Sequence, residues 1–255
     1  MRHNSSEKKL WDSGMEGRTE SAGFSRLAEL LAEVGRSLHS RGWALGTSGN
    51  FSAVVSREPL LLAITRSGLD KGELTAEQIL EVDADAKIVS VAQSPKVSTA
   101  GGNNARRAQE EDLTPARPSV ETKLHLAVVR ARDAGAVLHT HSVWSTILSE
   151  AHASRRGLTI EGYEMLKGLD GVRTHQHREW LPILENSQDI GALARAVETT
   201  LKQHPEAHGF LLRRHGLYTW GTDLAAAKRH VETLEFLMEV VGQLGFGRSS
   251  VEAGA

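Results

Sequence analysis

The sequence predicts a single α/β domain in which helices cover a central β-sheet. Two observations predict this fold class. Segments with helical apolar spacing alternate with short apolar segments along the chain, and no internal repeat divides its 255 residues. Hydrophobic residues make up 40% of the chain and charged residues 24%, as in ordinary globular proteins. We therefore expect one folded domain over residues 23–246.

The two ends and one internal segment depart from this pattern. Residues 1–22 are polar and mixed in charge, which predicts a disordered leader without the apolar segment of a secretory signal. Residues 247–255 are small and polar, and we expect a frayed tail. Residues 94–118 hold three of the six prolines and few apolar side chains, which predicts a mobile loop within the domain.

Before that loop, apolar residues three and four apart predict a helix over residues 24–42, which Gly42 would end. A loop rich in glycine, serine and asparagine follows at 46–52. Its backbone N–H and hydroxyl groups suit a phosphate, although the same residue types also form plain turns. The remaining elements expected in this half are strands at 53–55, 60–65 and 87–92 and a short helix at 74–82.

After the loop, helices are expected at 119–132, 143–150, 188–203 and 223–245, and strands from Ala136 and at 158–160, 209–212 and 217–220. Glu121 falls in the first turn of its helix, where an acidic residue suits the helix dipole. Residues 161–169 predict one or two helical turns bounded by glycines. Glu164 would face inward there, or outward if that turn is a solvated surface helix.

Composition excludes several classes of function. The formal net charge is −2 and no strongly basic segment exists, so we expect neither a nucleic-acid nor a membrane partner. The absence of cysteine excludes disulfides, thiolate metal sites and cysteine nucleophiles. No apolar segment approaches the roughly 18 residues of a membrane span. These features predict a cytoplasmic protein.

Two histidines stand at the end of the strand that begins at Ala136. Strand side chains alternate in direction, so His139 and His141 point the same way, about 6.5 to 7 Å apart along the chain. Two imidazoles at that spacing can converge on one metal ion. A chain with twelve histidines can also contain two of them at this spacing by chance. A second pair, His175 and His177, lies in a polar segment, and we expect it at the surface.

Several separated motifs together resemble the class II aldolase/adducin family over residues 24–245. Each motif is short, but all occur in the same order and spacing as in the family. They are Gly46-Thr47-Ser48-Gly49-Asn50-Phe51-Ser52, Ser67-Gly68, Pro118-Ser119-Val120-Glu121-Thr122, His139-Thr140-His141 and His215-Gly216.

The resemblance implies a single α/β/α layered domain with a mainly antiparallel central sheet, and a ring-shaped homotetramer. It also implies one Zn²⁺ per subunit, held by His139, His141 and His215 with an open position for substrate. The residues that it implies for a substrate phosphate are Thr47, Ser48, Gly49, Asn50, Ser67, Gly68 and Ser119.

Within the family, the chain is most similar to members that dehydrate a ketose phosphate. The segments that carry this similarity are Arg41-Gly42-Trp43, residues 161–169, Asn186-Ser187-Gln188-Asp189 and residues 215–221. It implies that Glu164 is the catalytic acid/base and that Glu121 is a second acid/base or a fourth metal ligand. The alternatives are a sugar-phosphate aldolase, disfavoured because Val120 replaces a serine of many aldolases, and a non-catalytic adducin-like interaction module.

Overall fold

The computed structural model describes residues 5–92 and 117–252, with side chains over 23–92 and 117–245. The loop expected at 94–118 therefore lies outside the described residues, except for Arg117 and Pro118. In the described part of the chain, no helix combines the length and the apolar character that crossing a bilayer requires.

A nine-stranded sheet forms the centre of the described structure, with the strand order β4-β3-β2-β1-β5-β9-β8-β7-β6. Neighbouring strands are antiparallel except β7 and β8, which are parallel. The mainly antiparallel sheet is thus confirmed. The strands are β1 (Asn50–Arg57), β2 (Leu60–Thr65), β3 (Ile79–Asp83), β4 (Ile88–Val91), β5 (Ala136–Thr140), β6 (Gly157–Glu161), β7 (Arg178–Leu184), β8 (Gly209–Leu212) and β9 (Gly216–Gly221).

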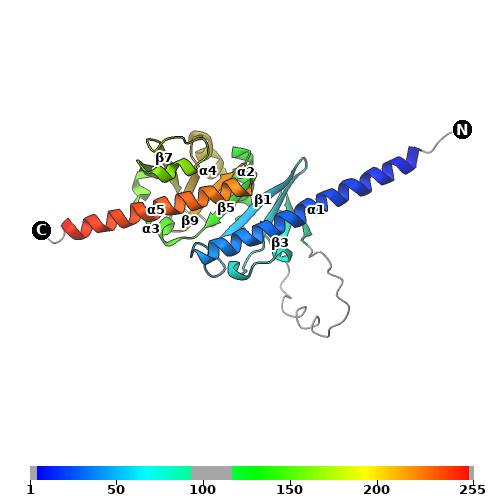
Figure 1. The fold of residues 1–255 in the computed structure, drawn as a ribbon, viewed down its shortest axis with the longest axis horizontal. Helices are drawn as coiled ribbons and strands as arrows, with labels where there is room; N and C mark the ends of the chain where they lie inside the picture. Colours follow the sequence, from blue (N-terminus) through cyan, green and yellow to red (C-terminus); the bar gives the residue numbers. More distant parts are fainter. Residues whose placement is uncertain (1–4, 93–116, 253–255) are drawn as a thin grey trace, which may run out of the picture.

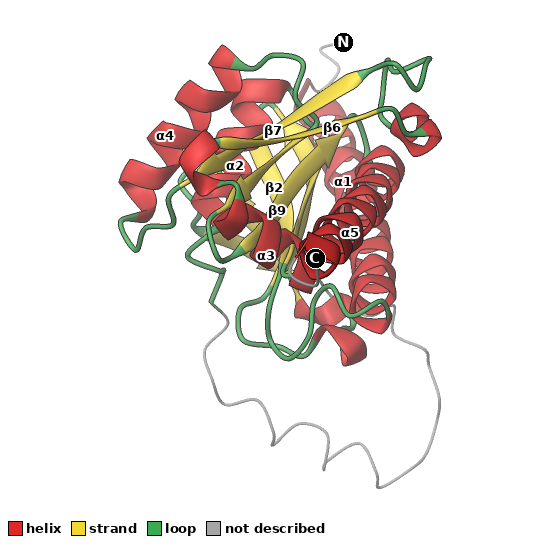
Figure 2. Ribbon diagram, turned by 90° about the vertical axis from the view of Figure 1, so that its left-hand side faces the viewer, coloured by secondary structure: helices red, strands yellow, loops and turns green. Residues whose placement is uncertain are grey.

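Helices cover both faces of this sheet, which confirms the α/β/α layering. In Figure 2, α1 and α5 lie on one side of the sheet and α2 and α4 on the other. The helices are α1 (Ser5–Ser40), α2 (Thr122–Arg132), α3 (Val143–Ala151), α4 (Ile190–Gln203) and α5 (Leu224–Glu252). Short 3₁₀ segments lie in the connections that lead to strands β3, β6 and β7: η1 (Lys71–Glu73), η2 (Ala76–Gln78), η4 (Ala153–Arg155) and η5 (Glu164–Gly168).

Strand β5 is central because it contributes to both hydrophobic cores. All five of its residues are buried. Ala136 and Leu138 pack in the core beneath α1 and α5, whereas Val137 packs in the core beneath α2 and α4. Strand side chains alternate between the two faces, so a strand that is buried on both faces has apolar residues at successive positions. This explains the apolar residues of β5 that precede His139.

Two elements differ from the sequence prediction. The helix expected at 74–82 is instead η2 followed by strand β3. Ile79 pairs with Thr65 and the next four residues continue the ladder with β2, so pairing with a neighbouring strand outweighs local helical spacing. Strand β7 was not predicted at all. It contains Glu179 and Pro182. A charged residue and a proline are uncommon inside a buried strand, so the sequence pattern does not indicate one here.

The ends of the fold also differ from expectation. Residues 5–22, expected as part of a disordered leader, belong to α1, and residues 247–252, expected as part of a frayed tail, belong to α5. Figure 1 shows both helices extending beyond the body of the domain. Neither stretch contains a proline, so a helix anchored on its core-packed turns can continue through polar residues.

Helix α3 packs against α5 where Trp144 meets Gly242. A Cβ atom placed on Gly242 would lie 2.1 Å from a carbon of the Trp144 indole ring, which is far inside van der Waals contact. Three residues further along the same helix, a Cβ atom on Gly245 would meet no atom within 4 Å. Gly242 is therefore required by packing, whereas Gly245 is not.

We expect Gly242→Ala to lower the free energy of unfolding by about 1–3 kcal/mol, the usual cost of overpacking a core. Gly245→Ala is the matched control, because alanine is favoured over glycine in helices by about 1 kcal/mol and no clash opposes it there. Denaturant titration of both variants measures the difference. Equal stability of the two variants would show that α3 does not depend on this contact.

Candidate metal centre and anion pocket

Three histidines meet at one end of the sheet. His139 lies near the end of β5, His141 follows that strand, and His215 lies in the turn that joins β8 to β9. Their Nε2 atoms are 2.8 Å apart between His139 and His141, 3.0 Å between His141 and His215, and 3.4 Å between His139 and His215. The structure thus brings together the three residues that the resemblance implied as metal ligands.

The ring of His139 is held in one orientation. Its Nδ1 atom lies 2.9 Å from the carbonyl oxygen of Leu217, which can only accept a hydrogen bond, so Nδ1 carries the proton. The lone pair is then on Nε2, which faces the other two rings. Tyr218 stacks on His139 with ring centroids 3.9 Å apart. A backbone carbonyl that fixes the tautomer in this way is typical of metal-binding histidines.

Burial keeps the three rings uncharged. It lowers the pKa of His139 well below its ordinary value and the pKa of His141 to about 4. Burial also lowers the pKa of His215, although the charge of Glu121 opposes this shift. Three neutral nitrogens therefore converge at neutral pH. Ligands at about 2.0–2.1 Å from a tetrahedral zinc ion lie about 3.3 Å from one another, so the spacing of these nitrogens fits such an ion.

Glu121 faces the three histidines. Its Oε1 atom lies 3.3 Å from His215 Nε2 and 3.7 Å from His139 Nε2. Although Glu121 occupies the N-cap position of α2, its side chain makes no capping hydrogen bond. Its Oε2 atom instead accepts a hydrogen bond of 2.6 Å from Asn50 Nδ2. The carboxylate therefore does not cap the helix through a hydrogen bond, although its place at the start of α2 still suits the helix dipole. Its side chain lies beside the histidines.

A buried chain of polar contacts holds Asn50. The Oδ1 atom of Asn50 bonds to His125 Nε2, and His125 Nδ1 lies 2.7 Å from Ser52 Oγ. Burial lowers the pKa of His125 to about 3, so the ring is neutral, donates through Nε2 and accepts from the serine hydroxyl. The sequence analysis missed His125. Its position four residues after Glu121, on the same side of a helix, was the available signal.

A partly open cavity of about 200 Å³ lies beside the histidines. All seven residues that the resemblance implied for phosphate binding line it. The complete lining is Thr47, Ser48, Gly49, Asn50, Arg66, Ser67, Gly68, Lys71, Ser119, Glu121 and His141. Because His141 and Glu121 border both the cavity and the histidine cluster, a molecule with its anionic group in this cavity would have its neighbouring atoms beside the cluster.

Lys71 is a residue of this cavity that the sequence analysis missed. Its side chain is almost fully buried, and its ammonium group donates hydrogen bonds of 2.8 Å to the carbonyl of Leu69 and 3.3 Å to that of Thr47. These bonds use two of its three N–H groups. Burial lowers its pKa to about 8, so Lys71 is mostly protonated at neutral pH. In the sequence it stands in a polar segment, where a lysine is ordinarily exposed.

Glu164 lies apart from these residues. In η5 its side chain is 69% exposed and pairs with Lys167 and, at 3.4 Å, with His175. The alternative that Glu164 faces inward is therefore wrong for a single chain. Leu166 is the residue of η5 that is buried, and the short helix packs against α5 on that side, which turns Glu164 toward solvent.

Comparison with known proteins gives consistent results. The sequence model of the Class II Aldolase and Adducin N-terminal domain matches residues 29–241. Methylthioribulose-1-phosphate dehydratase from Sorangium cellulosum is 40% identical over 222 residues, covering 87% of this chain and 93% of that protein. The enzyme of the same name from Marinobacter nauticus is 38% identical over 217 residues, covering 85% and 92%.

Solved structures show the same fold. The L-fuculose-1-phosphate aldolase from Thermus thermophilus superimposes with a TM-score of 0.61 at 24% identity, covering 86% of this chain and 95% of that one.

We expect Lys71→Met to weaken the binding of a simple phosphate monoester, such as glycerol phosphate, by about 10- to 100-fold at pH 7. The reason is that a hydrogen bond to a charged group contributes about 1.5–3 kcal/mol. Affinity of the unmodified protein should fall as the pH rises through about 8, since Lys71 then loses its proton. The phosphate remains a dianion over this range, because its second pKa is about 6.

Calorimetric titration at pH 7 and pH 9 measures both effects. Lys202→Met, which removes an exposed lysine of α4, is the matched control and should bind as the unmodified protein does. Unchanged affinity in Lys71→Met would show that this lysine does not contribute to anion binding.

Proposed function

The chain belongs to the class II aldolase and adducin family, and we propose that it is a zinc-dependent methylthioribulose-1-phosphate dehydratase. It would convert 5-methylthioribulose 1-phosphate to 2,3-diketo-5-methylthiopentyl 1-phosphate in methionine salvage. The observation that carries this proposal is the cluster of three neutral histidines beside a cavity of hydrogen-bond donors. The relatives of that name, about 40% identical over most of the chain, support it.

The donor set fits a catalytic metal site. His139, His141 and His215 would hold the ion through their Nε2 atoms, and three protein ligands leave a position for substrate. Bound there, zinc would supply Lewis acidity that makes a carbon next to a ketone easier to deprotonate. The cavity donors and Lys71 would bind the phosphate and so place the carbonyl end of the substrate beside the histidines.

The reaction requires a base and an acid. In this substrate the ketone is at C2 and hydroxyls are at C3 and C4. Loss of water removes the proton from C3 and the hydroxyl from C4, and the resulting enol tautomerises to the diketone. Glu121 is suited to proton transfer, because Asn50 holds its Oε2 atom while Oε1 is directed toward the histidines. We propose Glu121 as an auxiliary acid/base or a fourth ligand.

Glu164 is the proposed principal acid/base. Because Glu164 is exposed and apart from the histidines of its own chain, we propose that each site takes its Glu164 from a neighbouring subunit. A homotetramer, which we also propose, would allow this arrangement, since sites near subunit contacts can take residues from two chains. A carboxylate at the surface of one chain is then buried only in the assembly.

The two alternative functions have less support. A non-catalytic adducin-like module does not need three converging histidines, and all three are in place. The sugar-phosphate aldolase is similar to this chain at only 24% identity, whereas the dehydratases reach 40%. Incubation with 5-methylthioribulose 1-phosphate separates these alternatives by its product: a diketone with the carbon chain intact, two cleaved fragments, or no reaction.

We expect His141→Ala to lose both stoichiometric metal at this centre and dehydration, because two remaining imidazoles bind zinc weakly. Chelation should inactivate the unmodified protein, and added Zn²⁺ should restore it. His152→Gln, at a histidine outside the cluster, is the matched control. Elemental analysis and a coupled assay for the diketone provide the measurements. Full activity of His141→Ala, or of the chelated protein, would refute the zinc-dependent mechanism.

We expect Glu164→Gln to keep its metal and fold but to lose dehydration by at least about 100-fold, within the range that general acid–base catalysis contributes. Glu161→Gln, also exposed on this segment, is the control. Mixed oligomers of Glu164→Gln with His139→Ala should regain part of the activity if each site takes its glutamate from a neighbour. Substantial turnover by Glu164→Gln alone would overturn the assignment.

A further inference from the structure

A second cluster of histidines and a carboxylate lies at the other end of β8. His177 and Glu179 are at the start of β7, and His208 immediately precedes β8. Because β7 and β8 are parallel, their starts lie at the same edge of the sheet. His215, from the first cluster, follows the opposite end of β8, a strand of four residues or about 13 Å. The two clusters are therefore separate sites.

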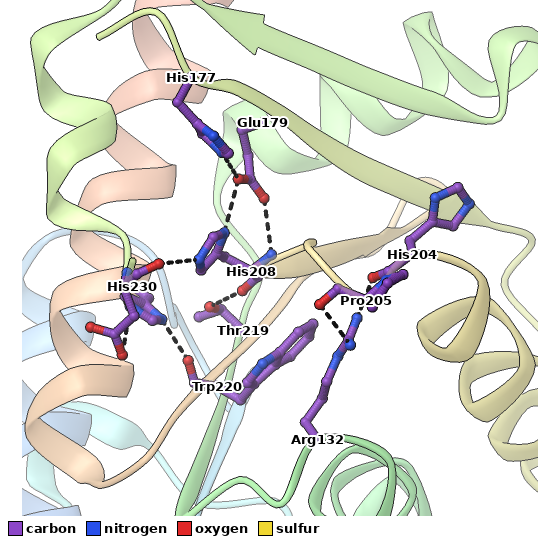
Figure 3. A network of polar contacts seen from close by, with 10 residues as sticks. Arg132, His177, Glu179, His204, Pro205, His208, Thr219, Trp220 and His230 are labelled. Carbon is purple, nitrogen blue, oxygen red and sulfur yellow. Dashed lines mark hydrogen bonds and ion pairs between the residues drawn. The ribbon is translucent and has the colours of Figure 1, made fainter. Parts of the chain in front are cut away.

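The polar atoms of this second cluster converge on one carboxylate oxygen (Figure 3). Glu179 Oε2 lies 2.9 Å from His177 Nε2 and 2.9 Å from His208 Nδ1. The other oxygen, Oε1, accepts a hydrogen bond of 2.9 Å from the backbone N–H of His208. The carboxylate is thus fixed in orientation, and it is 1% exposed. A carboxylate buried to this degree requires a positive partner.

The ring of His208 is oriented as a metal ligand would be. Its Nε2 atom lies 2.8 Å from the carbonyl oxygen of Asp170, so this nitrogen carries a proton and donates it. Nδ1 faces Glu179 Oε2 at 2.9 Å, so a cation would take the place of the proton between these two atoms. A backbone carbonyl that accepts from the far nitrogen is the usual outer partner of a ligating imidazole.

A neighbouring histidine, His230, does not belong to the donor set. Its Nδ1 atom donates to the carbonyl of Trp220 at 2.7 Å, and its Nε2 atom accepts from the backbone N–H of Asp170 at 3.0 Å. Backbone groups thus hold both of its ring nitrogens, and neither nitrogen is hydrogen-bonded to the Glu179 carboxylate. The available donors are two imidazole nitrogens and one carboxylate oxygen, all within 4.8 Å of one another.

We propose that His177 Nε2, Glu179 Oε2 and His208 Nδ1 form a second metal site, which binds zinc or a similar divalent transition ion. Two nitrogens and one oxygen suit zinc, whereas calcium and magnesium prefer all-oxygen sites. His177 and His208 also line a cavity of about 720 Å³, which gives the ion access and room for a water ligand. The ion would join the segment before β7 to the start of β8.

The metal content of the protein tests this proposal. Protein whose three-histidine centre is already loaded is titrated with Zn²⁺ by calorimetry, and bound metal is counted after gel filtration. We expect two ions per chain in the unmodified protein and one in His177→Gln. The side chain of His177 is 25% exposed at the rim of the cluster, so this substitution leaves the core intact. Binding of the second ion should also raise the melting temperature of the unmodified protein but not that of His177→Gln.

The control is His204→Gln, which changes a histidine that lies 3.9 Å from a single carboxylate, Glu206, and should still bind two ions. His141→Ala should keep one ion, at the second site, and the double variant His141→Ala/His177→Gln should bind none. These two variants show separately whether each of the two sites binds metal. One ion in the unmodified protein, or two in His177→Gln, would overturn the second site and leave an ordinary histidine–carboxylate pair.

Discussion

The pairing of β5 with β9 is the constraint on which the metal centre depends. In this antiparallel ladder Thr140 lies opposite Leu217, which places the Leu217 carbonyl where His139 can donate to it. The turn before β9 then carries His215 to the same point. Gly216 permits this approach, because a Cβ atom there would lie 2.0 Å from the carbonyl oxygen of Thr140. A shift of the register by one residue would turn His139 to the other face of the sheet.

A further contact anchors the end of β5 from the opposite face. Thr140, between the two histidines, directs its hydroxyl to Glu235 of α5 at 2.5 Å. Burial raises the pKa of Glu235 to about 7. The alternation of strand side chains thus serves two purposes at once. The histidines face the site, while the residue between them attaches the strand to the helix layer.

The two histidine clusters differ in their electrostatics. In the first, burial dominates and the rings are neutral. In the second, burial also disfavours charge on His208, but hydrogen bonds and the charge of Glu179 outweigh it and raise the pKa of the ring. The pKa of Glu179 is lowered by the same partner, in spite of its burial. A metal ion in the second cluster would displace a proton from the ring of His208. In the first cluster it would bind to imidazole rings that are already uncharged.

The sequence by itself determined the local features: the helices with clear apolar stripes, the buried strand from Ala136, the common direction of His139 and His141, and the motifs of the family. These follow from the periods of 3.6 and 2 residues, which act over a few neighbours. The same local reasoning failed at β3 and β7, where pairing with a distant strand decides the conformation.

Only the tertiary structure decided which distant side chains share a site. It placed the carboxylate of Glu121 beside the histidines, buried Lys71 in the anion cavity, and turned Glu164 to solvent. It also joined His177 to Glu179 and His208, although the sequence predicted a surface residue. Burial and contact between residues far apart in the chain depend on how the layers pack, and no local pattern of residue types records that packing.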